Sequence, residues 1–314
     1  MKKTIMFFTL FMFYSITLFA NGSTEGKIFF NHTTEFDEGG INAFNIKRAY
    51  LTFSNDVSSN VSYKITYDMG INNAGSAHTA FLKVAMVKLK TIFGDVSIGM
   101  QGMNMFKTME NTWGHRFIQK MPMDTYKFSP SADLGIGLSR RFGAMSTSAL
   151  VTNGGGYKKS ESDTHKKLSV HAVYGEAKLN KNDGFNIGTS FSVEPYDIDS
   201  ITSENTNVMG GFVGYAGSGF RGGVEFDTKQ QNDLTSQIIC IYGTYKISDK
   251  LSLLARIDQV DANTSVDEGG IQAIVAGVHY FVDNGFAVAP TFRMTTPEDG
   301  EAENSIVVNF QFTF

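Results

Sequence analysis

Hydrophobic and polar residues alternate with a period of two along most of the chain. In the segment VSYKITYDMG, the apolar residues Val61 and Ile65 share one face, and the polar residues Ser62 and Lys64 share the other. A period of two places successive side chains on opposite faces of a β-strand. The same alternation recurs in LSLLARIDQ, FAVAPTFRM and the final NFQFTF. The chain is therefore predicted to be all-β, with strands that are apolar on one face and polar on the other.

Segments of this kind follow one another from end to end. The connections between them alternate between tight turns, such as FGD and NKNDG, and longer polar loops, such as DIDSITSENTN. Short turns at one end and long loops at the other are typical of outer-membrane barrels, with periplasmic turns and extracellular loops. The predicted strands are residues 26–36, 45–55, 60–71, 80–91, 95–102, 132–142, 144–153, 166–179, 185–195, 206–216, 219–229, 235–247, 250–261, 270–282, 285–295 and 303–314.

This organisation predicts a single domain over residues 23–314. We expect a transmembrane antiparallel β-barrel of about sixteen strands, with an error of about two because some turn signals are weak. The segment 166–179 breaks the simple alternation, which predicts a β-bulge there.

The first 22 residues differ from the rest. Two lysines precede an apolar run from Ile5 to Phe19, and the small residues Ala20 and Gly22 follow it. This order is typical of a secretory signal peptide. A retained membrane anchor is the alternative, but the run is shorter than the roughly 20 residues that span a bilayer. Residues 1–22 are therefore predicted to be a signal peptide that leads to export.

The charge and the cysteine content of the chain exclude several classes of protein. The chain has 27 Lys and Arg against 31 Asp and Glu, for a net charge of −4, so no basic surface predicts nucleic-acid binding. Cys240 is the only cysteine, which excludes an intramolecular disulfide. No zinc-type spacing of Cys and His occurs, and we expect neither a metal nor a cofactor.

The terminal strand supports closure of a barrel. Phe310, Phe312 and Phe314 alternate with polar residues and would face lipid near the periplasmic interface, where aromatic girdles lie. Pairing of this strand with the first would remove both free edges. A terminal aromatic residue in this pattern also resembles the insertion signal of bacterial barrel proteins, which implies the barrel assembly machinery as a partner.

Several segments carry a family resemblance, namely FNIKRAYLTF, ADLGIGLSRRFG, LSLLARIDQVD and IVAGVHYF followed by FAVAPTFRM. With them the chain resembles Gram-negative outer-membrane porins, most closely the phosphate-selective porin O/P-like group. The resemblance implies a water-filled pore in the outer membrane for small hydrophilic solutes or ions, surrounded by outer-membrane lipids, in a homotrimer. The chain is shorter than the phosphate-selective members, and their phosphate-binding residues are not matched position by position.

The longest connection, residues 103–131, is the third long loop. In general porins this loop folds into the barrel and forms a constriction, and its Met, Phe and Trp content suits packing against a wall. An external cap or a subunit interface is the alternative. If the loop folds inward, the candidate constriction residues are Lys107, Glu110, Arg116, Lys120 and Asp124.

The alternation also assigns charges to the lumen wall, where cations outnumber acids. The cations are Arg48, Lys64, Lys88, Lys90, Arg141, Arg221, Lys246, Arg256 and Arg293, and the acids are Asp68, Asp133, Glu225, Asp227 and Asp258. Of the cations, Arg48, Lys88 and Arg256 are expected opposite the third loop, and Lys158 and Lys159 in an external loop. An excess of fixed positive charge predicts a mild anion preference. Cross-strand pairing that only stabilises the sheet is the alternative.

Enzymatic activity has little support in the sequence. His115, His165, His171 and His279 are scattered, and no G-x-S-x-G nucleophile motif occurs. A porin is therefore the preferred hypothesis. A structural or adhesive barrel without an open pore, and less so a barrel hydrolase, are the alternatives.

Overall fold

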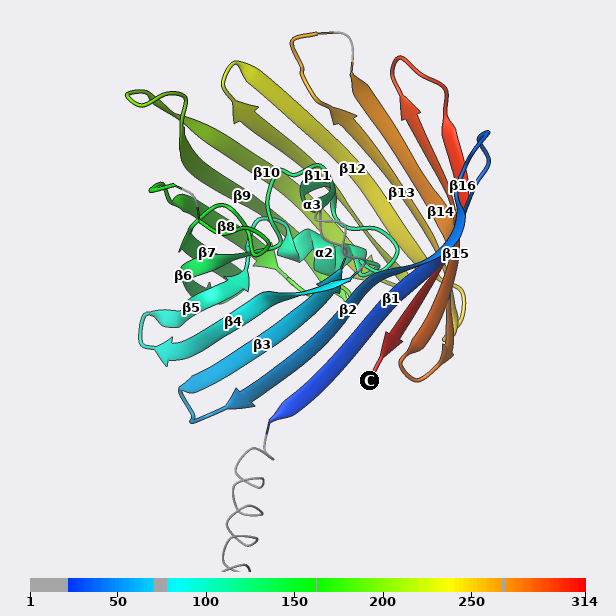
Figure 1. Ribbon diagram of the computed structural model, residues 1–314. Helices are drawn as coiled ribbons and strands as arrows, with labels where there is room; N and C mark the ends of the chain where they lie inside the picture. The colour runs from blue at the N-terminus through cyan, green and yellow to red at the C-terminus, as the bar shows by residue number, and fades with distance from the viewer. Residues whose placement is uncertain (1–21, 71–77, 162, 267–268) are drawn as a thin grey trace, which may run out of the picture.

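The computed structural model describes residues 22–70, 78–161, 163–266 and 269–314, so the predicted signal peptide lies outside the described residues except for Gly22. The described chain forms one closed antiparallel barrel of sixteen strands, in which each strand pairs with its neighbours in sequence (Figure 1). The strands are β1 (Ser23–Glu35), β2 (Asn42–Asp56), β3 (Val61–Gly70), β4 (Thr79–Thr91), β5 (Gly94–Gly102), β6 (Ala132–Phe142), β7 (Met145–Thr152), β8 (Lys167–Gly175), β9 (Gly184–Asp197), β10 (Ser203–Gly217), β11 (Phe220–Gln231), β12 (Leu234–Lys246), β13 (Leu251–Asp261), β14 (Gly270–Asp283), β15 (Phe286–Pro297) and β16 (Glu303–Thr313).

The barrel closes between β1 and β16. The register pairs Ile28 with Phe312 and Phe30 with Phe310, whose rings stack with centroids 4.7 Å apart. Beyond the last strand residue, the Phe314 amide donates to the Gly26 carbonyl at 3.0 Å, and the Gly26 amide donates back at 2.8 Å. The predicted pairing of first and last strands is confirmed.

The two faces of the wall have the expected chemistry. In β13, Leu253 and Ile257 are exposed on the outside, whereas Leu254, Arg256 and Asp258 are buried on the inside. This is the period-two pattern of a strand with one face toward lipid and one toward the lumen. Among the described residues, no helix is long and apolar enough to cross a membrane.

The structure differs from the prediction at the segment 166–179. Strand β8 ends at Gly175, and it pairs in continuous register with both neighbours, so the bulge predicted there is wrong. Register shifts occur instead in β2, where Lys47 is the extra residue, in β4 at Lys83, and near the end of β14. A bulge re-aims one side chain without a gap in the wall, so alternation alone cannot locate it.

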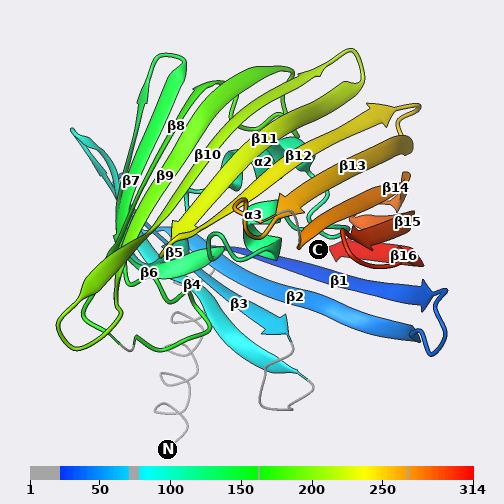
Figure 2. The same cartoon turned by 90° about the horizontal axis from the view of Figure 1, so that it is seen from above.

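The connection from β5 to β6 lies inside the barrel, as both views show (Figures 1 and 2). It contains two short helices, α2 (Lys107–Trp113) and α3 (Pro122–Thr125). Helix α2 packs against β10, β11 and β12, and α3 packs against β12. The loop residues Met105, Met109, Trp113, Met121 and Met123 are fully buried. The apolar core of this protein therefore lies between the loop and one side of the barrel wall.

Candidate functional site

Three arginines of the barrel wall hold the backbone of the third loop. Arg221 of β11 donates to the Trp113 carbonyl at 3.1 Å. Arg293 of β15 donates to the Ile118 carbonyl at 2.7 Å, and Arg256 of β13 donates to the Lys120 carbonyl at 2.7 Å. The sequence predicted these three side chains as lumen charges, and the structure uses them to position the loop. Arg256 is 1% exposed and lies beneath the loop.

The five predicted constriction residues form one ladder of ion pairs on the open side of the loop. The N–O distances are 2.6 Å for Lys107–Glu110, 2.7 Å for Arg116–Glu110, 3.1 Å for Arg116–Asp124 and 3.2 Å for Lys120–Asp124. Burial alone would raise the pKa of Glu110, but Arg116 and Lys107 beside it lower that pKa to about 2. The ladder thus carries three cations and two acids in a fixed arrangement.

Two cavities meet at this ladder. The outer one, toward the long loops, has a volume of about 720 Å³, and the inner one, toward the short turns, has about 680 Å³. Only Phe29, Tyr50 and Arg116, among the described residues, line both of them. These three residues therefore mark the boundary between the two spaces, with two wall residues facing one loop residue.

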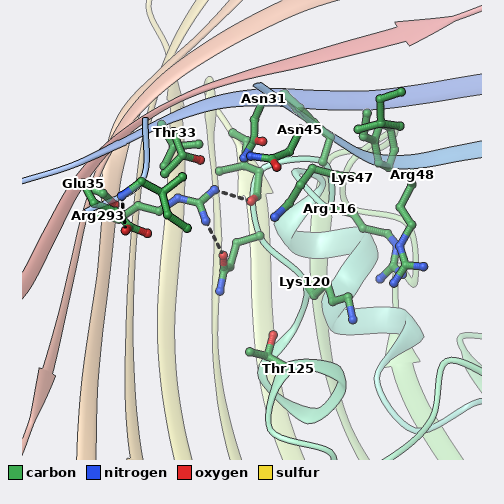
Figure 3. Close-up of a pocket in the computed structure, with 18 of the residues that line it drawn as sticks. Asn31, Thr33, Glu35, Asn45, Lys47, Arg48, Arg116, Lys120, Thr125 and Arg293 are labelled. Atoms are coloured by element: carbon green, nitrogen blue, oxygen red, sulfur yellow. Dashed lines mark hydrogen bonds between the residues drawn. The ribbon is translucent and has the colours of Figure 1, made fainter. Parts of the chain in front are cut away.

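Six cations and one acid line the outer cavity (Figure 3). In the close-up, Lys47 and Arg48 of β2 lie around the same space as Arg116 and Lys120 of the loop. The full set is Lys47, Arg48, Arg116, Lys120, Lys158 and Arg293, with Glu35 as the acid. Lys158 lies in the long connection from β7 to β8, where it was predicted, but this loop reaches the outer cavity and Lys158 lines it.

The inner cavity is also basic. Its charged residues are the cations Lys27, Lys64, Lys83, Lys107, Arg116 and Lys181 and the acids Glu25 and Glu110. Of the acids, Glu25 pairs with Lys27 at 2.6 Å and Glu110 pairs within the ladder. The positive charge is therefore continuous from one cavity to the other.

Asp68 of β3 organises the wall opposite the loop. Its buried carboxylate accepts a 2.6 Å hydrogen bond from the Tyr157 hydroxyl and lies 3.3 Å from Arg48 Nη1 and 3.7 Å from Lys83 Nζ. Burial and the hydrogen bond to Asp68 raise the pKa of Tyr157, which keeps its hydroxyl protonated as the donor. Asp68 thus ties the β7–β8 loop to the wall and fixes two cations.

Four cations of the two cavities were not predicted, namely Lys27, Lys47, Lys83 and Lys181, and bulges explain Lys47 and Lys83. Strict alternation places Lys47 and Lys83 on the lipid face. The extra residue in each strand turns them inward, so Lys47 lines the outer cavity next to Arg48, and Lys83 lines the inner cavity. Lys83 Nζ also lies 5.0 Å from the ring centroid of Tyr50. A lysine on the lipid face of a predicted strand is the signal that could have indicated a bulge.

The remaining predicted wall cations lie elsewhere. Lys88 pairs with Asp95 at 3.3 Å near the β4–β5 turn, rather than facing the loop as expected. Arg141 donates to the Gly143 carbonyl in the next turn, and Lys90 pairs in register with Asp95. Arg221 and Lys246 line a smaller cavity of about 380 Å³ beside His115.

The five predicted lumen acids are buried, and none of them lines the outer or the inner cavity in the described part of the chain. Asp133 accepts from the Gly154 and Gly156 amides, and Asp258 accepts from Arg256 at 2.7 Å through each oxygen. Glu225 and Asp227 lie on β11, the strand against which α2 packs. These five acidic side chains are therefore kept out of both cavities.

The described residues hold no cluster of three His, Cys, Asp or Glu side chains that could bind a metal ion. His165 Nε2 lies 2.7 Å from Asp197, and the Ser203 hydroxyl donates to the same Asp197 oxygen at 2.7 Å. The serine is thus bonded to the acid and not to the histidine.

Comparison with solved structures places the fold among outer-membrane porins. OmpF of Salmonella typhi, solved with daunomycin, superposes with a TM-score of 0.72 at 11% identity, covering 93% of this chain and 97% of that one. An anion-selective porin from Comamonas acidovorans gives 0.72 at 10% identity, covering 93% and 99%. OprB of Pseudomonas putida gives 0.71 at 9% identity, covering 96% of each chain. By sequence, no family model and no curated protein matches.

Proposed function

We propose that the chain forms a water-filled channel in the bacterial outer membrane, which passes small hydrophilic solutes by diffusion and prefers anions. The charge of the path carries this proposal. Cations outnumber acids in both cavities and at the boundary between them, whereas the five predicted lumen acids of the wall are buried and line neither cavity. Fixed charge of one sign in a narrow passage with low-dielectric walls concentrates counter-ions and excludes co-ions.

The fold supports the same conclusion. The described barrel resembles porins over more than nine-tenths of its length, and one of them is an anion-selective porin. OmpT of Vibrio cholerae has been solved in a trimer form, at 14% identity and a TM-score of 0.65. We extend the proposal to a homotrimer in outer-membrane lipid, inserted by the barrel assembly machinery. Selectivity for phosphate is not part of it.

Conductance across a planar bilayer tests the proposal. Refolded protein should give stepwise currents, and in a KCl gradient the reversal potential should have the sign of chloride preference. A reversal potential with the sign of potassium preference would overturn the proposed anion preference, but the proposal that the protein forms a channel would still stand. Absence of current steps at every pH would overturn the channel itself and favour a structural or adhesive barrel.

A further inference from the structure

The outer wall carries a groove that the pore does not explain. It crosses β6 to β9 on the lipid-facing side and has a volume of about 550 Å³. Its floor is a row of residues in direct register across the strands, in which Arg140 pairs with Thr147, Thr147 with Ala172, and Ala172 with Thr189. Small side chains in three successive strands make the floor shallow, with Arg140 at one end.

Larger side chains form the two sides of the groove. On one side, Leu138, Val170 and Phe191 belong to the next row of the register, with Ala149 between them. On the other side lies Phe142. Four strands at a spacing of about 4.8 Å give the floor a length of about 14 Å, which suits a flexible hydrocarbon chain.

The floor is apolar although it contains two threonines. The Thr147 hydroxyl donates to the Arg140 carbonyl at 3.3 Å, and the Thr189 hydroxyl donates to the Gly210 carbonyl at 2.8 Å. Both hydroxyls are therefore bonded to backbone carbonyls of the strands themselves. A ligand on this floor meets hydrocarbon and needs no hydrogen-bonding groups there.

Arg140 lies at the level of the wall where the headgroup of a phospholipid would lie. It stands two residues before the end of β6, at the short-turn edge, while Thr189 is five residues into β9, so the floor runs from that edge toward the middle of the wall. The edge is marked by the exposed rings of Phe93, Phe142 and Tyr174, the pattern of an interfacial girdle.

The charge of Arg140 has no acidic partner in the described part of the chain. Its guanidinium lies 4.9 Å from the Phe142 ring centroid and donates one long bond of 3.4 Å to the Phe93 carbonyl. Guanidinium binds phosphate with charge-assisted hydrogen bonds, and Arg140 lies at the edge of the wall, where the interfacial girdle is.

We infer that this groove binds one phospholipid, with an acyl chain along the Thr147–Ala172–Thr189 floor and its phosphate on Arg140. The inference rests on the lipid-facing side of the barrel and is independent of what the pore conducts. The ligand class requires both a hydrocarbon chain and a phosphate, as basic sites for lipid headgroups do elsewhere.

Native mass spectrometry of the refolded full chain in detergent, titrated with phosphatidylglycerol, tests the site. The barrel should retain one phospholipid, and diacylglycerol with the same chains should bind at least tenfold more weakly. Arg140→Gln should weaken phosphatidylglycerol binding about tenfold, because it removes the phosphate partner. Ala172→Phe should do the same by filling the floor. Ala255→Phe, on the outer face of β13 away from the groove, is the matched control and should bind as the unchanged protein does.

Equal phosphatidylglycerol binding by all four proteins would overturn the inference, as would equal binding of diacylglycerol. The same spectra report oligomeric state. If Ala172→Phe dissociates an oligomer while phospholipid binding per chain is unchanged, the groove is a contact between copies of this chain, and the phospholipid site is refuted. Bilayer conductance is measured separately, so failure of the lipid site leaves the channel proposal intact.

Discussion

Arg256 Nη1 donates a 2.7 Å hydrogen bond to the carbonyl oxygen of Lys120, so a buried wall residue fixes the backbone of a residue that lines the outer cavity. The same guanidinium binds both oxygens of Asp258 at 2.7 Å. The position of the Lys120 charge thus depends on an ion pair that no solute reaches. The shape of the outer cavity is therefore set by contacts behind the loop as well as by the loop itself.

Replacement of Arg256 should loosen the third loop. Arg256→Gln leaves the Asp258 carboxylate buried without its partner, which costs about 3–5 kcal/mol. Trp113 is the only tryptophan and is fully buried in the loop, so its fluorescence reports the packing of this segment. We expect a red-shifted emission, a lower urea midpoint and a noisier open-channel current. The double variant Arg256→Gln/Asp258→Asn should recover part of the loss, because no buried charge remains.

Arg141→Gln is the matched control for that experiment, since within the described residues Arg141 bonds only to a turn carbonyl in the same hairpin. Its Trp113 emission should equal that of the unchanged protein. An Arg256→Gln urea midpoint as high as that of Arg141→Gln would show that the bond to Lys120 does not hold the loop.

Charge reversal on the loop should change ion selectivity. Arg116→Glu/Lys120→Glu replaces two cations of the ion-pair ladder with acids, and the reversal potential in a KCl gradient should move toward cation preference. Lys166→Glu/Lys250→Glu has the same net charge change at residues outside the outer and inner cavities and should move it much less. Shifts of equal size in the two variants would mean that Arg116 and Lys120 do not control the path.

The ion-pair ladder should resist acid. The pKa of Glu110 in the folded protein is about 2, below the ordinary value of 4.5. A lowered pKa stabilises the carboxylate form, so this contribution is fully present above pH 4.5 and is lost as pH falls toward 2. Trp113 emission should therefore stay constant from pH 7 to about pH 4. The variant Glu110→Gln lacks the stabilising contribution of this carboxylate at every pH. The difference between the variant and the unchanged protein therefore measures that contribution. A change in emission centred near pH 4.5, absent from Glu110→Gln, would contradict the lowered pKa.

Removal of the terminal residue should impair assembly. Phe314 exchanges two backbone hydrogen bonds with Gly26, and its ring packs so close to Gly26 that a Cβ there would lie 2.2 Å from Phe314 Cζ. Deletion of Phe314 should reduce the heat-modifiable folded band in outer-membrane fractions several-fold. Phe93→Ala removes an equally exposed ring from a turn and should have a smaller effect. If the protein lacking Phe314 still folds fully, this residue is not needed for insertion into the membrane.

Alternation predicted the strands well because a barrel wall has one lipid face and one lumen face at every position. It also assigned Arg48, Lys64 and Arg293 correctly to the spaces inside the barrel. It could not place Lys47 and Lys83, because a one-residue bulge shifts the alternation of inward and outward side chains by one residue, and the amino-acid composition of the strand does not reveal the shift.

The role of the other lumen residues depends on which side of the barrel the third loop covers. Arg256 and Asp258 carry the same pattern in sequence as Arg48, yet they lie beneath the loop and Arg48 faces the cavity. This choice arises from packing between Met123, Trp113 and strands β10 to β12, which are distant in sequence. Local periodicity contains no information about such contacts.

The seam between β1 and β16 is the one pairing in the described barrel between strands that are far apart in the chain. Every other pairing in the described barrel joins strands that are consecutive in the chain, and each can form as a local hairpin. The seam joins Lys27 to Thr313, so no enclosed lumen exists until the final strand has been added. Each earlier species is an open, curved sheet with two unpaired edges, which bind other strands readily. Formation of the seam therefore removes the last two strand edges that another chain could bind.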